Sequence, residues 1–197
     1  MQKTGLFFGS FNPVHIGHLV IAGYMKEFTD LDEIWFVVSP HNPLKIKSSL
    51  LADRDRLYLV DLAIGDREAF RSSDIEFNRP LPSYTIDTMA LLTEKYPNRG
   101  FVLIMGEDNL YTLHKWKNAE ELVKRFPVYV YPRPDAIKNN NEQLKTIIDK
   151  ASIKWVDAPL MQISGSFIRK GIKAGKDMSY FLHPAVWKYI IEMHFYK

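Results

Sequence analysis

Hydrophobic residues follow two alternating patterns along this chain. Short continuous apolar runs are typical of strands buried on both faces, as in parallel sheets. Longer stretches with an apolar residue at every third or fourth position predict amphipathic helices. The runs predict strands at 6–8, 33–39, 70–77, 101–105, 128–131 and 153–156. The helical spacing predicts helices at 16–28, 51–64, 85–96, 118–126 and 185–195, with Ser83 or Thr85 as the cap of the third. Two more helices are predicted, one that ends at residue 150 and one that is opened by residues 163–169.

This alternation of strands and helices predicts the α/β class. We expect a doubly wound, mainly parallel, Rossmann-like sheet with helices on both faces. Residues 101–105 form the most apolar run, so we place them near the sheet centre. No repeat or linker divides the chain. Residues 1–197 are therefore predicted to form a single domain, with a C-terminal helical part from about residue 164.

Composition and net charge exclude several classes of function but do not identify one. A chain of 197 residues with 46% hydrophobic residues can bury a full core. A net charge of +3 is too weak to argue for nucleic-acid binding. The absence of cysteine excludes disulfides and thiol chemistry. No apolar run reaches the roughly 18 residues that span a bilayer, and no signal peptide is evident. We expect no membrane partner and a cytoplasmic location.

The first predicted strand-to-helix junction carries a histidine pair. The strand breaks at Gly9, where a backbone without Cβ allows close approach, and the helix restarts at Ile16. His15 and His18 are three residues apart, so both lie on one helical face. A helix N-terminus favours anions, and imidazole donors there make a phosphate site. A packed or capping role suits one histidine, but the pair favours the phosphate site.

Residues 163–169 open a second helix with similar features. Ser164 or Ser166 can cap this helix, and Gly165 leaves room for a ligand to approach the backbone. Arg169 lies one turn after Ser166 and can face the same anion. An ordinary capped surface helix is the alternative. The histidine pair elsewhere in the chain favours the anion site.

Four further residues are candidates with open alternatives. Lys45, in the proline-rich segment 40–49, is either a cation over phosphates or part of a solvated linker. Arg133, between two prolines, is an anion contact or a surface charge. Asp108 is a helix N-cap, a ligand contact or both, and Trp116 stacks on a ligand or packs in the core. Neither a glycine-rich dinucleotide fingerprint nor a P-loop is present.

No catalytic nucleophile can be assigned from spacing. The other histidines are too scattered to predict a metal site. No Ser-His-Asp set stands out either. This inventory of anion donors favours a reaction without a covalent enzyme intermediate.

Five motifs together resemble bacterial nicotinate-nucleotide adenylyltransferases, a family of the nucleotidyltransferase superfamily with a (T/H)xGH signature. The matching segments occur in the family's order at 9–18, 40–45, 82–85, 106–116 and 163–169. Asn12 stands where the family usually has Asp, Leu44 replaces a loop His, and Gly165-Ser166 replaces Ser-Thr. Each departure leaves in place the groups that the chemistry needs.

The resemblance implies adenylyl transfer from ATP to nicotinate mononucleotide, giving deamido-NAD and pyrophosphate for NAD biosynthesis. The implied catalytic residues are His15, His18, Lys45 and Arg169, with the histidines as electrostatic clamps. ATP would contact Gly9, Ser10, Phe11, His15, His18, Lys45, Arg133, Ile163, Ser164, Ser166 and Arg169. The mononucleotide would face Thr85, Gly106, Asp108 and Trp116. Mg²⁺ would be bound through the ATP phosphates, with no protein ligand assigned.

Other functions stay open at this point. Pantetheine-phosphate adenylyltransferase, or another small-substrate nucleotidyltransferase such as a cytidylyltransferase, is the enzymatic alternative. The former is usually shorter and has Thr at the position of His15. The His-Ile-Gly-His run also occurs in class I aminoacyl-tRNA synthetases, which need more chain than this one has. A non-catalytic nucleotide-binding regulator is the alternative from another class. Acid or amide preference and oligomeric state are undetermined.

Overall fold

The strands of this fold form one parallel sheet. The structure, a computed structural model, describes residues 1–40, 50–134, 136–137 and 141–197. Within them the sheet order is β3-β2-β1-β4-β5-β6, with every neighbouring pair parallel. The strands are β1 (Gln2–Gly9), β2 (Glu33–Val38), β3 (Phe70–Ser73), β4 (Arg99–Gly106), β5 (Val128–Tyr131) and β6 (Ile153–Trp155). The predicted α/β class and the central place of 101–105 are confirmed.

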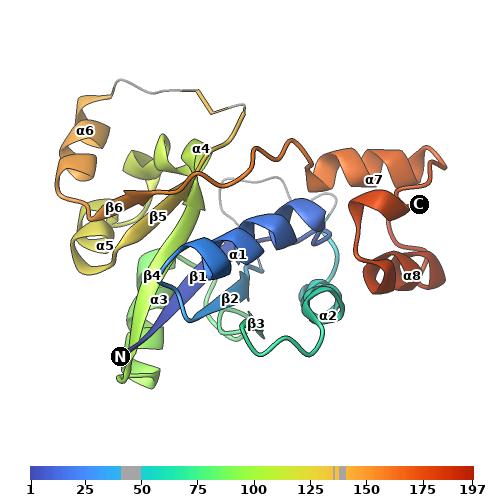
Figure 1. The fold of residues 1–197 in the computed structure, drawn as a ribbon, viewed down its shortest axis with the longest axis horizontal. Coiled ribbons are helices and arrows are strands. Elements are labelled where there is room, and N and C mark those ends of the chain that lie inside the picture. The colour runs from blue at the N-terminus through green and yellow to red at the C-terminus, as the bar shows by residue number, and fades with distance from the viewer. Residues whose placement is uncertain (41–49, 135, 138–140) are drawn as a thin grey trace.

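Helices connect the strands (Figure 1). The longer ones are α1 (Ile16–Phe28), α2 (Asp53–Ile64), α3 (Thr85–Lys95), α5 (Ala119–Arg125), α6 (Glu142–Asp149), α7 (Gly165–Lys173) and α8 (Pro184–Glu192). A short helix α4 (Glu107–Leu110) and two 3-10 turns, η1 (Leu113–Lys115) and η2 (Ser179–Phe181), complete the described elements.

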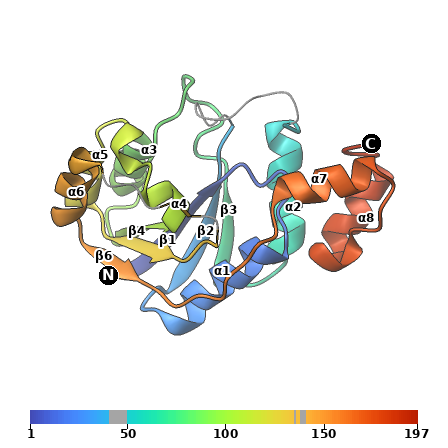
Figure 2. The same cartoon turned by 90° about the horizontal axis from the view of Figure 1, so that it is seen from above.

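Alternating strand side chains build two cores, one on each sheet face. Phe7 points into a core that includes residues of α1, α2, α7 and α8. Leu6, its neighbour, points into the opposite core with residues of α3, α5 and α6. Figure 2 shows these two helical layers on either side of the sheet. Helices α7 and α8 extend the first layer beyond the sheet edge, where α8 packs against α2 (Figure 1).

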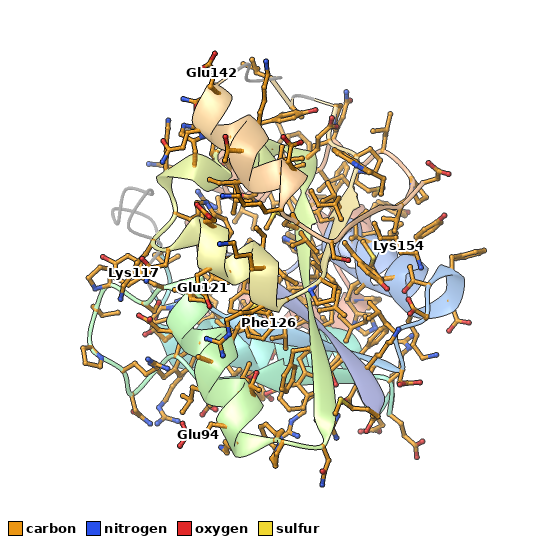
Figure 3. All side chains as sticks on the ribbon, turned by 90° about the vertical axis from the view of Figure 1, so that its left-hand side faces the viewer. Glu94, Lys117, Glu121, Phe126, Glu142 and Lys154 are labelled. Carbon is orange, nitrogen blue, oxygen red and sulfur yellow. The ribbon has the colours of Figure 1, made fainter. Side chains whose placement is uncertain are left out.

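The α3, α5 and α6 layer presents charged side chains to solvent. Figure 3 looks onto this layer, where Glu94, Glu121 and Glu142 point outward. Leu144 and Ile147 of α6 are buried beneath. This division between a charged and an apolar face explains why helical spacing in the sequence located these elements.

Several predicted boundaries need correction. The predicted strand 70–77 ends at Ser73, because residues 74–77 form a turn in which Phe77 N–H donates to the Asp74 carbonyl. The helix predicted from 51 begins at Asp53, and the backbone N–H of Leu51 donates to Asn12 instead. The last helix covers Pro184–Glu192 rather than 185–195. The short α4 and the 3-10 turns were not predicted.

The predicted cap of α3 is wrong. Tyr84 occupies the N-cap position, and neither Ser83 nor Thr85 caps the helix with its side chain. The Ser83 hydroxyl instead donates to the buried carboxylate of Glu76, which also accepts from the Thr88 hydroxyl at 2.7 Å. Glu76 thereby holds the segment before α3 against the helix.

A large-to-small change at the sheet centre tests this core. Leu103 in β4 is 1% exposed, so Leu103→Ala should lower the free energy of unfolding by about 2–5 kcal/mol. Leu160→Ala, at a 63% exposed side chain, should change it by less than about 0.5 kcal/mol. Urea unfolding followed by circular dichroism measures both. Equal stabilities for the two variants would contradict the assigned core.

Candidate functional site

A pocket of about 320 Å³ opens where β1 and β4 end. The sheet order reverses direction between these strands, and open α/β sheets bind ligands at such a crevice. Three distant segments converge there: the β1–α1 loop, the end of β5, and the N-terminus of α7. The described residues of the predicted ATP set all line it: Gly9, Ser10, Phe11, His15, His18, Arg133, Ile163, Ser164, Ser166 and Arg169. Lys45 lies outside the described residues.

The β1–α1 loop is shaped by a folded-back aromatic ring. Phe11 is 1% exposed and has a φ of 43°, in the left-handed region that a bulky residue rarely adopts. Its ring lies across the end of β1, where a Cβ on Gly9 would come within 2.8 Å of it. The same ring packs edge-on against His18, with centroids 5.0 Å apart. Glycine at position 9 therefore makes room for Phe11, which supports His18.

The two histidines stack on each other at the start of α1. Their ring centroids are 3.7 Å apart and the ring planes differ by 28°. The backbone N–H of His15 donates to Nδ1 of His18 at 3.2 Å. Because Nδ1 of His18 is the acceptor, the neutral ring carries its proton on Nε2. His18 is half-buried and lines the pocket.

His15 is a neutral ring at physiological pH. Its side chain is buried beside α1, where a Cβ on Gly17 would lie only 3.0 Å from its Nδ1. Burial lowers the pKa of His15 to about 4, and the positive charge of Arg133 adds to this lowering. The role of both histidines as electrostatic clamps stays a prediction, in which His15 would act without a positive charge. His15 offers ring dipoles and steric support rather than a positive charge.

The N-terminus of α7 supplies a serine cap and an arginine. Ser164 is the N-cap, and its side chain accepts from Phe167 N–H at 3.2 Å, which resolves the choice between Ser164 and Ser166. Ser166 instead accepts from Nη2 of Arg169 at 3.2 Å. Nη1 of Arg169 donates to the carbonyl of Asn12 at 2.8 Å. The guanidinium thus ties α7 to the β1–α1 loop at the pocket wall.

Gly165 serves a different contact from the predicted one. A Cβ at this position would lie 2.7 Å from the Asn12 carbonyl oxygen. The backbone of the β1–α1 loop therefore occupies the space that we expected a ligand to use. The segment between β6 and α7 also runs alongside α1 (Figure 1, Figure 2), with Ile163 3.7 Å from a Cβ built on Gly17.

The end of β4 contributes an acidic group that faces an arginine. Gly106 is the N-cap of α4, so Asp108 lies in its first turn and is not the cap. The Asp108 carboxylate lies 3.7 Å from Nε of Arg133. A Cβ on Gly106 would come within 2.4 Å of that carboxylate and 3.0 Å of the Arg133 side chain. Gly106 thus permits the pairing of Asp108 with Arg133.

Sequence reasoning missed some of the lining. Tyr131, the last residue of β5, lies between Phe7 and the Arg133–Asp108 pair, and burial raises the pKa of its hydroxyl to about 12. Asn109 and Met161 also line the pocket. Position at a strand end could have indicated Tyr131, since it precedes the Pro132-Arg133 stop.

Arg56 is a second residue that the sequence did not indicate. Its side chain is completely buried, and it donates to the carbonyls of Ser10, Ser39 at 2.9 Å and Leu51 at 3.1 Å. Its charge is balanced by Asp53 at 2.6 Å. Burial lowers the pKa of Arg56, but an arginine stays protonated at working pH. Arg56 therefore joins the β1–α1 loop to the end of β2 and the start of α2.

Two predicted mononucleotide residues lie apart from the pocket lining. Thr85 is the first residue of α3 and is half-buried. Trp116 is half-buried and packs against the core beneath α3 and α5. Asp108 lines the pocket and Gly106 adjoins the Asp108–Arg133 pair, so the structure brings only part of this set to the pocket.

Two features are absent from the described residues. No group of three or more histidine, aspartate or glutamate residues is arranged to hold a metal ion within the described ranges. In the same ranges no helix has the length and apolar character to cross a membrane.

Comparison with known proteins gives the family. The model of a cytidylyltransferase-like family matches residues 6–171. A protein of Flavobacterium johnsoniae named as a probable nicotinate-nucleotide adenylyltransferase is 53% identical, with both chains covered completely. A protein of the same name from Bacteroides thetaiotaomicron is 47% identical over 96% of this chain and 91% of its own. This chain belongs to the nicotinate-nucleotide adenylyltransferase family.

Solved structures agree with this fold. The nicotinic acid mononucleotide adenylyltransferase of Plasmodium falciparum, complexed with NaAD, has a TM-score of 0.80 at 20% identity, covering 100% of this chain and 98% of its own. A putative nicotinate-nucleotide adenylyltransferase of Vibrio parahaemolyticus has a TM-score of 0.73 at 22% identity, covering 100% and 96%. At these identities the likeness shows a shared fold alone.

The buried neutral His15 predicts a pH dependence of stability in this family member. Between pH 6.5 and about 4 the unfolded chain binds a proton at His15 that the folded chain does not. Stability is therefore fully present above pH 6.5 and falls as the pH approaches 4. Wild type should lose about 3 kcal/mol more than His15→Asn over this interval. Urea unfolding at pH 7, 6, 5 and 4.5 measures the difference, and parallel curves for the two proteins would contradict a depressed pKa.

Proposed function

We propose that this chain transfers the adenylyl group of ATP to nicotinate mononucleotide, releasing pyrophosphate and forming deamido-NAD. The carrying observation is the convergence of the His15–His18 pair and the Ser166–Arg169 pair on one pocket at the β1–β4 crevice. The names of relatives about half identical over the whole chain support this assignment. The P. falciparum neighbour, complexed with NaAD, supports it as well.

The geometry suits direct transfer between two phosphates. An oxygen of the mononucleotide phosphate attacks the α-phosphorus of ATP, and the bond to the bridging oxygen of the β-phosphate breaks. The electron pair of that bond leaves with pyrophosphate, so no proton has to be removed from the nucleophile. Catalysis then consists of alignment and stabilisation of charge on phosphate oxygens. A pocket lined by N–H donors meets this requirement.

Each donor has a distinct position in this scheme. His18 lines the pocket at the start of α1 and would direct its Nε2–H to the α-phosphate. Neutral His15 stacks beneath it and fixes its orientation. Arg169 is the cation at the α7 N-terminus and would hold the β- and γ-phosphates with Ser166. Lys45, outside the described residues, stays a predicted additional cation.

Mg²⁺ is the expected companion of ATP. The only carboxylate in the described pocket lining is that of Asp108, which already faces Arg133 at 3.7 Å. Such a donor set fits an ion held by phosphate oxygens and water rather than by a protein cage. When bound, the ion neutralises charge on the phosphates. This chain's residues then orient the phosphate oxygens that the ion does not contact.

The acceptor side of the site, which would bind nicotinate mononucleotide, is proposed at the C-terminal end of β4 and the N-terminal end of α3. Asp108 lines the pocket, Gly106 adjoins the Asp108–Arg133 pair, and Thr85 and Trp116 follow from the family resemblance. Buried Glu76 supports this side by holding Ser83 and Thr88.

The C-terminal helical part belongs to the same catalytic unit, because α7 supplies Ser164, Ser166 and Arg169. A cytoplasmic location stays a prediction.

A pyrophosphate-release assay tests the reaction. The protein is incubated with ATP, Mg²⁺ and nicotinate mononucleotide, and parallel reactions contain the amide mononucleotide or phosphopantetheine. We expect pyrophosphate with a pyridine mononucleotide and none with phosphopantetheine. Turnover with phosphopantetheine alone would establish the alternative adenylyltransferase. ATP binding without any turnover would indicate a nucleotide-binding regulator.

Substitutions at His18 test its role as a donor. His18→Ala should lower kcat by about 10²-fold, the usual scale for one transition-state donor. Glutamine places an amide N–H near the position of Nε2, whereas asparagine mimics Nδ1. His18→Gln should therefore retain more activity than His18→Asn. An unchanged kcat in a folded His18→Ala variant would exclude this role.

Trp116→Ala tests the acceptor side. If its ring lies against the pyridine ring, the KM for nicotinate mononucleotide should rise more than the KM for ATP. Steady-state kinetics with each substrate varied in turn measures both constants. Equal increases would assign Trp116 to core packing instead.

A further inference from the structure

The last residues of the chain return to the β1–α1 loop. The Tyr196 hydroxyl donates to Oδ1 of Asn12 at 2.8 Å, across 184 positions of sequence. The C-terminus lies beside α7 in both views (Figure 1, Figure 2). A second hollow of about 510 Å³ has Tyr196, Arg169 and Ser166 in its wall. The tail is therefore adjacent to the residues proposed to hold the ATP phosphates.

Asn12 is the point where three segments meet. Its Oδ1 accepts from Tyr196 and also from the backbone N–H of Leu51 at 3.2 Å. Its carbonyl accepts from Nη1 of Arg169 at 2.8 Å. Asn12 is 6% exposed, so these hydrogen bonds are shielded from competing water. Tyr196 is thus separated from the Arg169 guanidinium by a single residue.

The tail is held in this position against a local backbone cost. His194 and Tyr196 have φ values of 55° and 65°, both in the left-handed region. Each such residue costs about 1 kcal/mol or more and persists only where the surroundings compensate. The compensating contacts include Phe195, which packs edge-on against Tyr189 of α8 at 5.8 Å. Burial raises the pKa of the Tyr196 hydroxyl, so this group stays protonated and donates at all working pH values.

We propose that Tyr196 is a positioning residue for the ATP side of the site. Its hydroxyl fixes the side chain of Asn12, and the Asn12 carbonyl then fixes Arg169 toward the phosphates. The proposal rests on the proposed function, since it assigns Arg169 to ATP. It adds the last segment of the chain to the residues on which ATP binding depends.

Tyr196→Phe removes only the hydroxyl and tests the proposal directly. The KM for ATP should rise about five- to tenfold, the equivalent of one lost hydrogen bond. The KM for nicotinate mononucleotide should change by less than about twofold. Tyr189→Phe is the matched control, since Tyr189 lies in α8, contacts the same tail through Phe195, and should leave both constants unchanged. A lowered melting temperature with both constants unchanged would assign Tyr196 to stability alone and overturn the proposal.

A double variant tests the route through Asn12. If Tyr196 acts through Asn12, the KM for ATP of Asn12→Ala with Tyr196→Phe should equal that of Asn12→Ala alone. Multiplied effects would show that the tyrosine acts independently of Asn12 and would overturn this route.

Carboxypeptidase digestion of the unmodified protein gives a measurement that needs no variant. Linkage requires that a ligand favoured by the docked tail also favours docking. Saturating ATP should therefore slow the release of Tyr196 several-fold after Lys197 is removed, and nicotinate mononucleotide alone should not. Release unaffected by ATP would overturn the proposal. If wild type binds ATP with this protection yet forms no pyrophosphate, the proposed function fails while the positioning role of Tyr196 stands.

Discussion

The β1–α1 loop must keep its carbonyl groups hydrogen-bonded without regular secondary structure, and two arginines supply the donors. Arg56 of α2 donates to the Ser10 carbonyl, and Arg169 of α7 donates to the Asn12 carbonyl. A buried carbonyl without a donor costs about 1–3 kcal/mol. The loop therefore has its observed shape only while α2 and α7 are docked. The phosphate pocket forms as a result of the complete fold.

The two arginines differ in their exposure to the pocket. Arg56 is fully enclosed, is neutralised by Asp53, and has no free direction toward a ligand. Arg169 is half-buried at the pocket wall, where its remaining N–H groups can meet an anion. Between them lie two stacked imidazoles, of which the deeper is neutral. The pocket therefore combines two described arginines with the two imidazoles: Arg133, which faces Asp108, and Arg169 on α7.

Local patterns predicted what depends on neighbours in sequence. The bounds of α1 and β5 follow from apolar spacing, and the observed bounds equal the predicted ones. Helix N-termini, glycines and histidines predicted two anion sites by type and spacing, and His15, His18, Ser166 and Arg169 do line one pocket. Their roles toward ATP stay a prediction. Arg56 could not be found this way, since an arginine in an amphipathic helix looks solvent-exposed. The neutrality of His15 and the contact of Tyr196 with Asn12 both come from packing between distant segments.

Two departures from the usual family pattern, Asn12 and Gly165, are 153 positions apart in sequence and touch in space. A Cβ at 165 would collide with the Asn12 carbonyl, whose oxygen also accepts from Nη1 of Arg169. The contact involves the backbone of Asn12, so it depends on the path of the β1–α1 loop and not on the side chain at position 12. Introducing a side chain at position 165 would therefore require the β1–α1 loop to move away from α7, and that movement would also withdraw the Asn12 carbonyl from Arg169.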